Sequence, residues 1–369
     1  MKKILDLPTP CLVLDLDRFE SNLERMSAFT SQRCIALRPH AKTHKCVQIA
    51  RRQLQKGAIG ICVATIAEAE VMVSAGVRGI LITAEMVGEP KISRLIDVVS
   101  QAPDTMVVVD DVTNARDLQQ RAVSAGIRIS VLIDLDIGQN RTGIQSGKPA
   151  LDLAEYISNA GNLQLRGICA YAGHVAHVTG FANRVERSQQ VMSQAVSTRD
   201  ALAKAGHNME ILSGASTGTY NIDSNIEGVT ELQSGSYVFM DAEYRRIGGQ
   251  RGALYDDFAP ALCVLATVIH RSQNKTVVDA GLKAFATDRP FGPEPFGIDG
   301  IIYEFAGDEH GRLLLKDANR KIQPGDKLRF ISPHCDPTVN LYDRIHCVRG
   351  ETVEDVWPIM ERASGSPNF

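Results

Sequence analysis

Eight short runs of apolar and β-branched residues alternate with segments of helical pattern between residues 34 and 233, and this alternation limits the fold more than any other feature. The runs are nearly continuous in apolar residues, which is typical of parallel strands buried on both faces. Eight such units over about 200 residues predict an α/β fold, a (β/α)8 barrel of the TIM type. A doubly wound open sheet is the alternative, because a count of strands does not show closure. The expected strands cover residues 34–40, 58–64, 79–83, 106–111, 127–135, 163–171, 209–214 and 229–233.

The segments between these strands carry helix signals. Residues 67–75, 114–125 and 185–205 have helical patterns, and a glycine follows each of them directly. Glycine just past the last turn is a common helix stop, because it adopts the left-handed conformation without strain. A further helix is expected at residues 90–99.

The pattern changes at residue 250. Beyond it, apolar runs are separated by Gly, Pro, Asn and Asp turns and show no helical period, which predicts an antiparallel β domain. Residues 9–16 form a similar run ahead of the barrel pattern, and we expect them to pair with this β domain. The predicted domains are therefore a barrel over residues 17–248 and a β domain of residues 1–16 plus 249–369.

The charge balance and the cysteines exclude several kinds of function. With 40 Lys and Arg against 43 Asp and Glu, the chain has a net charge of −3, so no nucleic-acid or membrane partner is expected. None of the eight cysteines forms a CxxC pair, which argues against a thiolate zinc cluster or a redox motif. No signal-peptide core and no membrane-spanning apolar run of about 18 residues is found, which predicts a cytoplasmic protein.

Polar residues after the first strand indicate amine chemistry. Active groups of (β/α)8 barrels lie at the C-terminal ends of the strands. Lys42 lies there between His40 and His44, and a cationic or desolvated neighbourhood makes a lysine amine a usable nucleophile. The alternative is an ordinary solvated lysine. Arg141, after the fifth strand, is a candidate contact for an anionic part of a cofactor, or else pairs with a neighbouring aspartate.

Two loops rich in Gly, Ser and Thr follow the seventh and eighth strands. Residues 213–220 read SGASTGTY and residues 233–237 read QSGSY, without an acidic side chain. Such loops let backbone N–H groups and hydroxyls approach a phosphate, and barrels often bind phosphate after these strands. No nucleotide-binding motif occurs there, so a small phosphorylated group fits better. A lysine, two phosphate-type loops and a barrel together indicate pyridoxal phosphate bonded to Lys42.

The segment SPHCDPTVN, residues 332–340, contains a second candidate site. His334 and Asp336 are two positions apart, so on a strand both side chains would project to one face. A histidine nitrogen with a carboxylate oxygen suits a divalent metal such as Mn2+, Mg2+ or Zn2+. A turn that contains a buried histidine and a capping aspartate is the alternative.

Several ordered motifs resemble those of the D-threonine aldolase family. They are RPHAKTHK after the first strand, GASTG after the seventh, ELQSGSYVFMDAEY after the eighth, and HCDPTVNLYD near the C-terminus. This family is grouped with 3-hydroxy-D-aspartate aldolases and D-serine dehydratases, and it has the alanine racemase-like fold. The resemblance covers nearly the whole chain.

The resemblance implies roles residue by residue. It implies that Lys42 bonds pyridoxal phosphate and that His177 is the catalytic histidine. It implies a divalent metal on His334 and Asp336, with Mn2+ or Mg2+ ahead of Zn2+. The other implied cofactor contacts are Arg141, Tyr171, Thr217, Gly218, Gly235, Ser236 and Tyr244.

The chain departs from the family at a few positions. Many relatives have GGGTG where this chain has GASTG, and Gln where it has Ala64. These differences leave undecided which substrate side chain the protein accepts. Dehydratase relatives tend to have a His-x-Cys metal pair, whereas His334 and Asp336 form the His-x-Asp pair that resembles the aldolases.

The function implied by the resemblance is that of an aldehyde-lyase. It would cleave D-configured β-hydroxy-α-amino acids, such as D-threonine, D-phenylserine or 3-hydroxy-D-aspartate, to glycine and an aldehyde. The alternatives are a metal-dependent dehydratase of D-serine or D-threo-3-hydroxyaspartate, an amino-acid racemase, and a pyridoxal-phosphate carrier protein. The expected partner is a small amino-acid substrate, with a homodimer as the candidate assembly.

Overall fold

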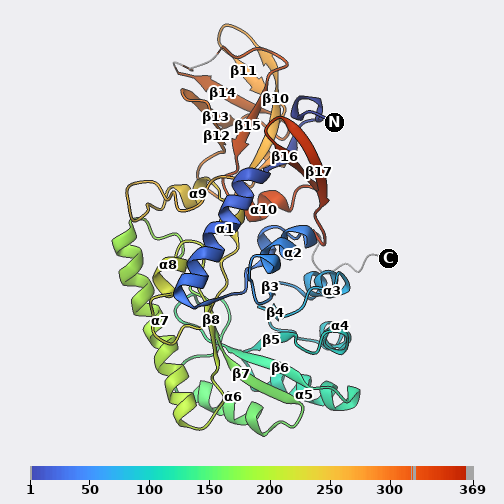
Figure 1. Cartoon of the computed structure of the whole chain (residues 1–369), viewed down its shortest axis with the longest axis vertical. Coiled ribbons are helices and arrows are strands. Elements are labelled where there is room, and N and C mark those ends of the chain that lie inside the picture. The colour runs from blue at the N-terminus through green and yellow to red at the C-terminus, as the bar shows by residue number, and fades with distance from the viewer. Residues whose placement is uncertain (1, 317, 319–320, 363–369) are drawn as a thin grey trace. The chain divides into compact units, whose positions relative to one another are not determined.

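The computed structural model describes residues 2–316, 318 and 321–362, and these residues divide into two compact units (Figure 1). Residues 27–235 form the first unit, here called the barrel unit. The described parts of residues 2–26 and 236–362 form the second, here called the β unit. Each unit is described by itself below.

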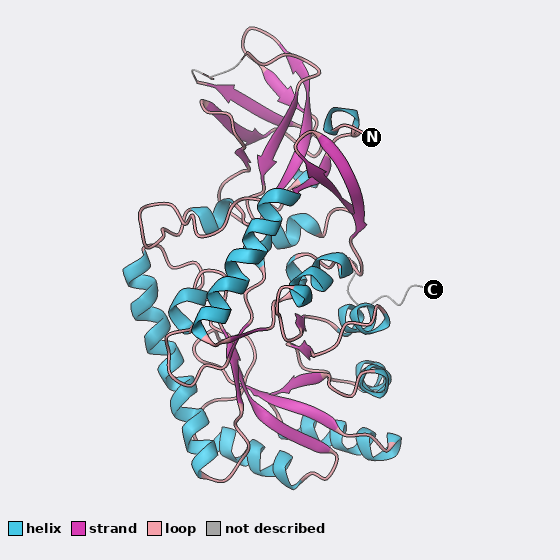
Figure 2. Ribbon diagram, in the orientation of Figure 1, coloured by secondary structure: helices cyan, strands magenta, loops and turns pink. Residues whose placement is uncertain are grey.

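The barrel unit is built on eight parallel strands in the order β2-β9-β8-β7-β6-β5-β4-β3. In Figure 2, helices lie around the strands of this unit. An isolated parallel bridge between His40 and Cys62, with the Cys62 N–H donating to the Pro39 carbonyl, connects the first strand to the last of this order. The sheet therefore closes, which confirms the (β/α)8 barrel and not the open doubly wound sheet. The strands are β2 (Ala36–Leu37), β3 (Ile61–Val63), β4 (Ile80–Ile82), β5 (Met106–Val109), β6 (Ile129–Asp134), β7 (Leu163–Ala170), β8 (Ile211–Gly214) and β9 (Glu231–Leu232), one within each expected run.

Helices connect the successive strands of the barrel. One of them is α5, which begins cleanly because the Asp111 carboxylate accepts the N–H groups of Thr113 and Asn114, and which ends at Gly126 with a φ of 66°. The expected helices are confirmed as α3, α4, α5 and α7, although α7 begins at Phe181 instead of residue 185. These helices are α2 (Val47–Gln55), α3 (Ile66–Ser74), α4 (Glu89–Gln101), α5 (Val112–Ala125), α6 (Lys148–Asn159), α7 (Phe181–Lys204) and α8 (Tyr220–Asp223). A further helix, α1 (Leu16–Arg33), precedes β2, and its residues up to Met26 belong to the β unit.

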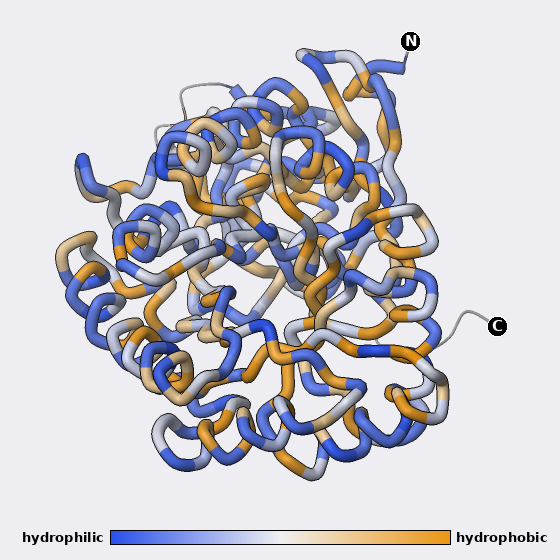
Figure 3. Tube along the Cα trace, turned by 60° about the horizontal axis from the view of Figure 1, so that its bottom comes forward, coloured by the Kyte–Doolittle hydropathy of each residue, from blue (hydrophilic) through white to orange (hydrophobic). Residues whose placement is uncertain are grey.

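Side chains of the barrel strands alternate between two apolar clusters. Residues such as Ile61, Val63 and Ile133 pack in one cluster with residues of the helices. Cys62 and Leu132, one position away, belong to a second cluster that contains strand residues alone. Because successive side chains of a strand point to opposite faces, the second cluster fills the inside of the barrel. The helical segments in Figure 3 carry both hydrophobic and hydrophilic stretches, as helices with one buried side do.

The β unit contains a nine-stranded sheet to which the N-terminal strand belongs. Strand β1 pairs antiparallel with β10 and parallel with β16, which confirms that residues 9–16 join the C-terminal strands. The sheet is mostly antiparallel, as expected, and the β1–β16 pair is its parallel exception. The strands are β1 (Cys11–Asp15), β10 (Leu262–Arg271), β11 (Thr276–Val278), β12 (Glu294–Pro295), β13 (Ile301–Phe305), β14 (Gly311–Leu315), β15 (Lys327–Ile331), β16 (Arg344–Arg349) and β17 (Thr352–Pro358), with the short helices α9 (Ala242–Arg245) and α10 (Cys335–Val339).

The limits of the units differ from the domain limits expected from the sequence. Residues 17–26 and 236–248, expected with the barrel, contact the β unit instead. For residues 236–248, the reason lies in their hydrogen bonds to the C-terminal part of the β unit. The buried Asp241 carboxylate accepts the Cys335 N–H at 2.8 Å, and the Ala242 N–H donates to the Ser332 carbonyl at 3.0 Å.

In the described part of the chain, no helix has the length and apolar character needed to cross a membrane.

Candidate active site

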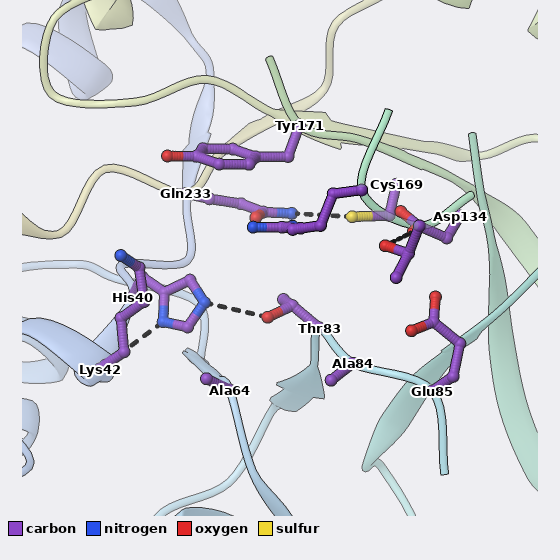
Figure 4. Close-up of a pocket in the computed structure, with 12 residues that line it drawn as sticks. His40, Lys42, Ala64, Thr83, Ala84, Glu85, Asp134, Cys169, Tyr171 and Gln233 are labelled. Carbon is purple, nitrogen blue, oxygen red and sulfur yellow. Dashed lines mark hydrogen bonds between the residues drawn. The ribbon is translucent and has the colours of Figure 1, made fainter. Parts of the chain in front are cut away.

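A cavity of about 270 Å3 lies in the barrel unit, where the strands end (Figure 4). Lys42 and His40 lie on one side of it, and Glu85 and Asp134 lie on the other. Three residues that the sequence nominated for the cofactor, Lys42, Arg141 and Tyr171, line this one cavity. The remaining lining residues are Ala64, Thr83, Ala84, Thr142, Cys169 and Gln233.

Lys42 is presented by a single 3-10 turn, Ala41–Thr43, which follows β2. His40 precedes this turn, and its Nδ1 accepts the Lys42 backbone N–H at 3.3 Å. Its Nε2 lies 2.9 Å from Thr83 Oγ1 at the end of β4. The histidine therefore fixes the turn that carries the lysine, a role that its proximity in the sequence does not reveal.

Arg141 and Tyr171 are neighbours in the cavity. The Arg141 guanidinium carbon lies 5.7 Å from the centre of the Tyr171 ring. The loop that carries Arg141 is shaped by Asp136, whose carboxylate accepts the N–H groups of Gly138 and Asn140. Burial alone would raise the pKa of Asp136, but these hydrogen bonds outweigh burial and hold the pKa below its ordinary value. Arg141 lines the cavity together with Asp134, and its charge lowers the pKa of that carboxyl, although burial outweighs this effect.

An acidic pair closes the far side of the cavity. Burial raises the pKa of Glu85 and also that of Asp134. The charge of Asp134 raises the pKa of Glu85 further, whereas a hydrogen bond with Glu85 lowers that of Asp134. Thr142, the residue after Arg141, donates its hydroxyl to Asp134 at 2.9 Å. Asp134 thus holds the loop that carries Arg141.

The two loops nominated for phosphate are buried but differ in what they contact. Gly235 lies so close to the lysine turn that a Cβ there would be 2.7 Å from Thr43 Oγ1 and 2.8 Å from the His40 carbonyl oxygen. The hydroxyls of Thr43 and Ser234 are buried without a hydrogen-bond partner among the described residues. Buried hydroxyls of this kind call for a polar group that they can bind.

The other loop carries Thr217 and Gly218, which are both buried. The fully buried Arg184 of α7 donates to the Gly218 carbonyl and to the Val178 carbonyl, each at 2.8 Å. Arg184 thereby ties this loop to the segment after β7 that contains the half-buried His177. The sequence did not single out Arg184, because an arginine inside a helical pattern carries no signal of burial.

The proposed metal residues belong to the β unit, and their local structure corrects one expectation. The segment does not adopt the strand geometry expected for it, because His334 is the extended residue before α10 and Asp336 lies in the first turn of that helix. Pro337 is tolerated in a first helical turn and would disrupt a strand, which explains the difference. Asp336 accepts the hydroxyl of Ser236 at 3.4 Å, and so connects with a residue that the sequence nominated for the phosphate.

Two aspartates that the sequence did not nominate lie next to this pair. Asp288 Oδ2 is 2.7 Å from His334 Nδ1, and Asp241 accepts the Cys335 N–H. Burial raises the pKa of Asp241 to about 6, although His334 acts in the opposite direction. Tyr244, whose ring is buried, has its backbone N–H on Asp241 as well, at 2.9 Å. No group of three or more metal-binding side chains occurs among the residues that the structure describes.

Comparison with known proteins now places these residues in a family. The profile described as "Alanine racemase, N-terminal domain" matches residues 14–243, and the profile described as "Putative serine dehydratase domain" matches residues 261–348. A 3-hydroxy-D-aspartate aldolase of Paracoccus denitrificans (strain Pd 1222) is 36% identical over 98% of this chain and 93% of its own. A D-threonine aldolase of an Arthrobacter species is 38% identical over 96% and 92%. This chain belongs to the D-threonine aldolase and 3-hydroxy-D-aspartate aldolase family.

Solved structures agree with membership of this aldolase family. The D-threonine aldolase from Filomicrobium marinum has a TM-score of 0.93 at 38% identity and covers 98% of both chains. A D-threo-3-hydroxyaspartate dehydratase variant, described as in the metal-free form, has a TM-score of 0.86 at 28% identity over 98% of this chain and 99% of its own. The aldolases are thus the more similar relatives in both sequence and structure.

Proposed function

We propose that this protein is an aldolase that depends on pyridoxal phosphate and a divalent metal, and that it cleaves D-configured β-hydroxy-α-amino acids to glycine and an aldehyde. The observation that carries the proposal is the cavity in which Lys42 lies with Arg141 and Tyr171, in a chain of this aldolase family. D-Threonine, D-phenylserine and 3-hydroxy-D-aspartate are the candidate substrates.

The donors around the cavity fit pyridoxal phosphate. Lys42 offers an amine for a carbonyl carbon, and Arg141 offers a cation to an acceptor of the ring. The buried hydroxyls of Thr43 and Ser234 beside Gly235 have no hydrogen-bond partner in the described part of the chain, and they suit a phosphate. We propose Thr217, Gly218, Gly235 and Ser236 as phosphate contacts, and Tyr171 and Tyr244 as ring contacts. When bound, pyridoxal phosphate supplies an electron sink for the negative charge that develops at the substrate Cα.

The donors of the β unit fit a divalent metal. Nδ1 of His334 bonds Asp288, and Nε2 is the nitrogen that would bind a metal. Asp336 supplies a carboxylate oxygen. This set suits Mn2+ or Mg2+, and also Zn2+. When bound, such an ion supplies a Lewis acid that lowers the pKa of the substrate's β-hydroxyl.

Within this mechanism His177 removes the proton from the β-hydroxyl as the Cα–Cβ bond breaks. Histidine suits this step because it accepts and returns protons near neutral pH. Arg184 positions the segment of His177 through the Val178 carbonyl. Arg141 places its guanidinium in the cavity lining, and the hydrogen bond from Thr142 to Asp134 fixes the loop that carries Arg141.

The first experiment identifies the lysine. Purified protein with pyridoxal phosphate should have a visible absorbance band that Lys42→Ala loses, whereas the exposed control Lys148→Ala keeps it. Borohydride reduction followed by peptide mass measurement should place the pyridoxyl group on Lys42. A pyridoxyl group on another lysine would contradict the proposal.

The second experiment identifies the reaction. The protein with pyridoxal phosphate and Mn2+ is offered D-threonine, D-phenylserine, 3-hydroxy-D-aspartate and D-serine, and the products are identified by mass. Glycine plus an aldehyde supports the aldolase. EDTA should abolish turnover and Mn2+ should restore it, while the absorbance band persists because the cofactor is held by other residues.

A dehydratase is the second candidate, because residues 261–348 match the serine dehydratase profile. It would release a keto acid and ammonia instead of glycine, so the same mass measurement separates the two. Activity that resists EDTA and interconverts enantiomers would instead support a racemase. A cytoplasmic location and a homodimer are also part of the proposal, to be checked by fractionation and by light scattering.

A further inference from the structure

The histidine of the proposed metal pair has a carboxylate on one of its two ring nitrogens. Nδ1 of His334 lies 2.7 Å from Oδ2 of Asp288. An ionised carboxylate only accepts, so in a neutral ring the proton lies on Nδ1 and the lone pair on Nε2. Nε2 makes no hydrogen bond to residues 2–316, 318 or 321–362. The ring is therefore set to offer Nε2 as a ligand.

The segment that carries Asp288 is fixed to the helix that follows His334. The Thr338 hydroxyl donates to the His334 carbonyl at 2.7 Å and accepts the Ala286 N–H at 2.9 Å. One hydroxyl thus joins the two backbones close to both side chains. Phe285, just before this contact, is buried in an aromatic cluster of the β unit. Asp288 therefore approaches His334 from a rigid base and not from a free loop.

A purely structural role for Asp288 would be an ion pair with its neighbour. Arg289 does lie 2.9 Å from the same carboxylate, but it also lies 2.6 Å from Glu243 and divides its charge between the two. The Asp288 side chain is 42% exposed, so its replacement leaves no buried cavity. If Asp288 is replaced, Arg289 keeps Glu243 as a partner, whereas Nδ1 of His334 loses the hydrogen bond that it makes among the described residues.

We propose that Asp288 is a positioning residue, which fixes the tautomer and orientation of His334 so that Nε2 binds the divalent metal. Carboxylates that accept from the second nitrogen of a metal-binding histidine raise the ligand's basicity and restrict the ring. This inference rests on the proposed function, because it assumes that His334 and Asp336 bind the metal.

The experiment measures Mn2+ binding directly, on the full chain loaded with pyridoxal phosphate. Mn2+ alone is titrated by calorimetry, and free Mn2+ is counted by electron paramagnetic resonance. Asp288→Asn keeps an acceptor for Nδ1–H but loses the charge, so we expect affinity to fall about 10-fold. Asp288→Leu loses both, and we expect a fall of about 100-fold. The control Asp299→Asn removes an exposed aspartate of the same unit and should bind like the unchanged protein.

The outcomes distinguish a failure of this inference from a failure of the proposed metal-dependent function. A positioning role is supported if Mn2+ affinity falls in Asp288→Asn and falls further in Asp288→Leu, while the absorbance band and the melting temperature stay unchanged. Equal affinity in all Asp288 variants, while Asp336→Asn fails to bind, overturns the inference and leaves the proposed function standing. Loss in Asp288→Asn as complete as in Asp336→Asn would make Asp288 a ligand and also overturn it. If the unchanged protein binds no Mn2+, the metal-dependent function and this inference fall together.

Discussion

Nε2 of His40 lies 2.9 Å from Oγ1 of Thr83, while Nδ1 of the same ring accepts the backbone N–H of Lys42. Because a backbone N–H can only donate, Nδ1 carries no proton, and the ring proton of neutral His40 lies on Nε2. Thr83 then accepts from His40 and donates to the Val63 carbonyl at 3.1 Å. Three neighbouring strand ends are thus joined to the turn that presents the lysine.

Thr83→Val keeps the shape of this site and removes the acceptor of the His40 ring. A buried donor left without a partner costs about 1–3 kcal/mol. We expect a lower free energy of unfolding by that amount and weaker cofactor binding, measured by urea denaturation and by titration of the visible band. Thr83→Ser keeps the hydroxyl and should behave like the unchanged protein; if both variants lose equally, the hydrogen bond is not the cause.

Gly235→Ala should displace the lysine turn. The added Cβ would lie 2.7 Å from Thr43 Oγ1 and 2.8 Å from the His40 carbonyl, distances that force the backbone to move. We expect a destabilisation of about 1–3 kcal/mol and reduced cofactor affinity. Gly161→Ala is the matched control, because a Cβ there meets nothing within 4 Å. Unchanged affinity in Gly235→Ala would show that the close approach does not matter to the site.

Arg38→Met should destabilise the barrel unit strongly. Arg38 forms two hydrogen bonds of 3.0 Å with Glu231, and both side chains are buried. Removal of one partner leaves a buried charge and costs about 3–5 kcal/mol. The double variant Arg38→Met/Glu231→Leu should recover part of the loss in urea denaturation. Lys148→Ala, which breaks an exposed pair, should cost at most about 0.5 kcal/mol.

Asp223→Asn should change how stability depends on pH. Burial raises the pKa of Asp223 to about 6, although the hydroxyls of Ser188 and Thr219 partly offset it. The folded state therefore holds this proton more firmly than the unfolded chain, and the contribution of Asp223 is present below pH 4 and lost as pH rises through about 6. Relative to the unchanged protein, the variant should gain about 2–3 kcal/mol between pH 4 and pH 7.

The measurement is urea denaturation at several pH values across that range. Asp117→Asn, an exposed substitution in α5, is the control and should follow the unchanged protein at every pH. A stability difference between Asp223→Asn and the unchanged protein that stays constant with pH would contradict the prediction.

The barrel strands could be predicted because each is a short, nearly continuous apolar run. Residues 129–134, for example, form the buried strand β6 within the expected range. Closure could not be predicted, because it depends on the contact of His40 with Cys62, which no local pattern encodes. The strand geometry expected for His334 and Asp336 was wrong. It rested on their spacing alone and did not consider Pro337, which favours the first turn of a helix.

The chemistry of the cavity was also predictable only in part. Lys42, Arg141 and Tyr171 could be nominated from motifs, and they line one cavity. Glu85 and Asp288 could not, because single acidic residues in loops are common, and their significance comes from neighbours that are distant in the sequence. The roles of Thr217, Gly218 and His177 stay predictions.

Strand β1 lies between β10 and β16, and this position has a consequence for how the protein is made. A ribosome completes the apolar segment CLVLD first, yet its partner β16 emerges only after residue 344 has been added. Until β10 emerges both edges of the segment can pair with other nascent chains, and from then until β16 emerges one edge can still do so. Yield in a foreign host should therefore depend on chaperone supply, and a solubilising fusion ahead of residue 11 should help more than one at the opposite end.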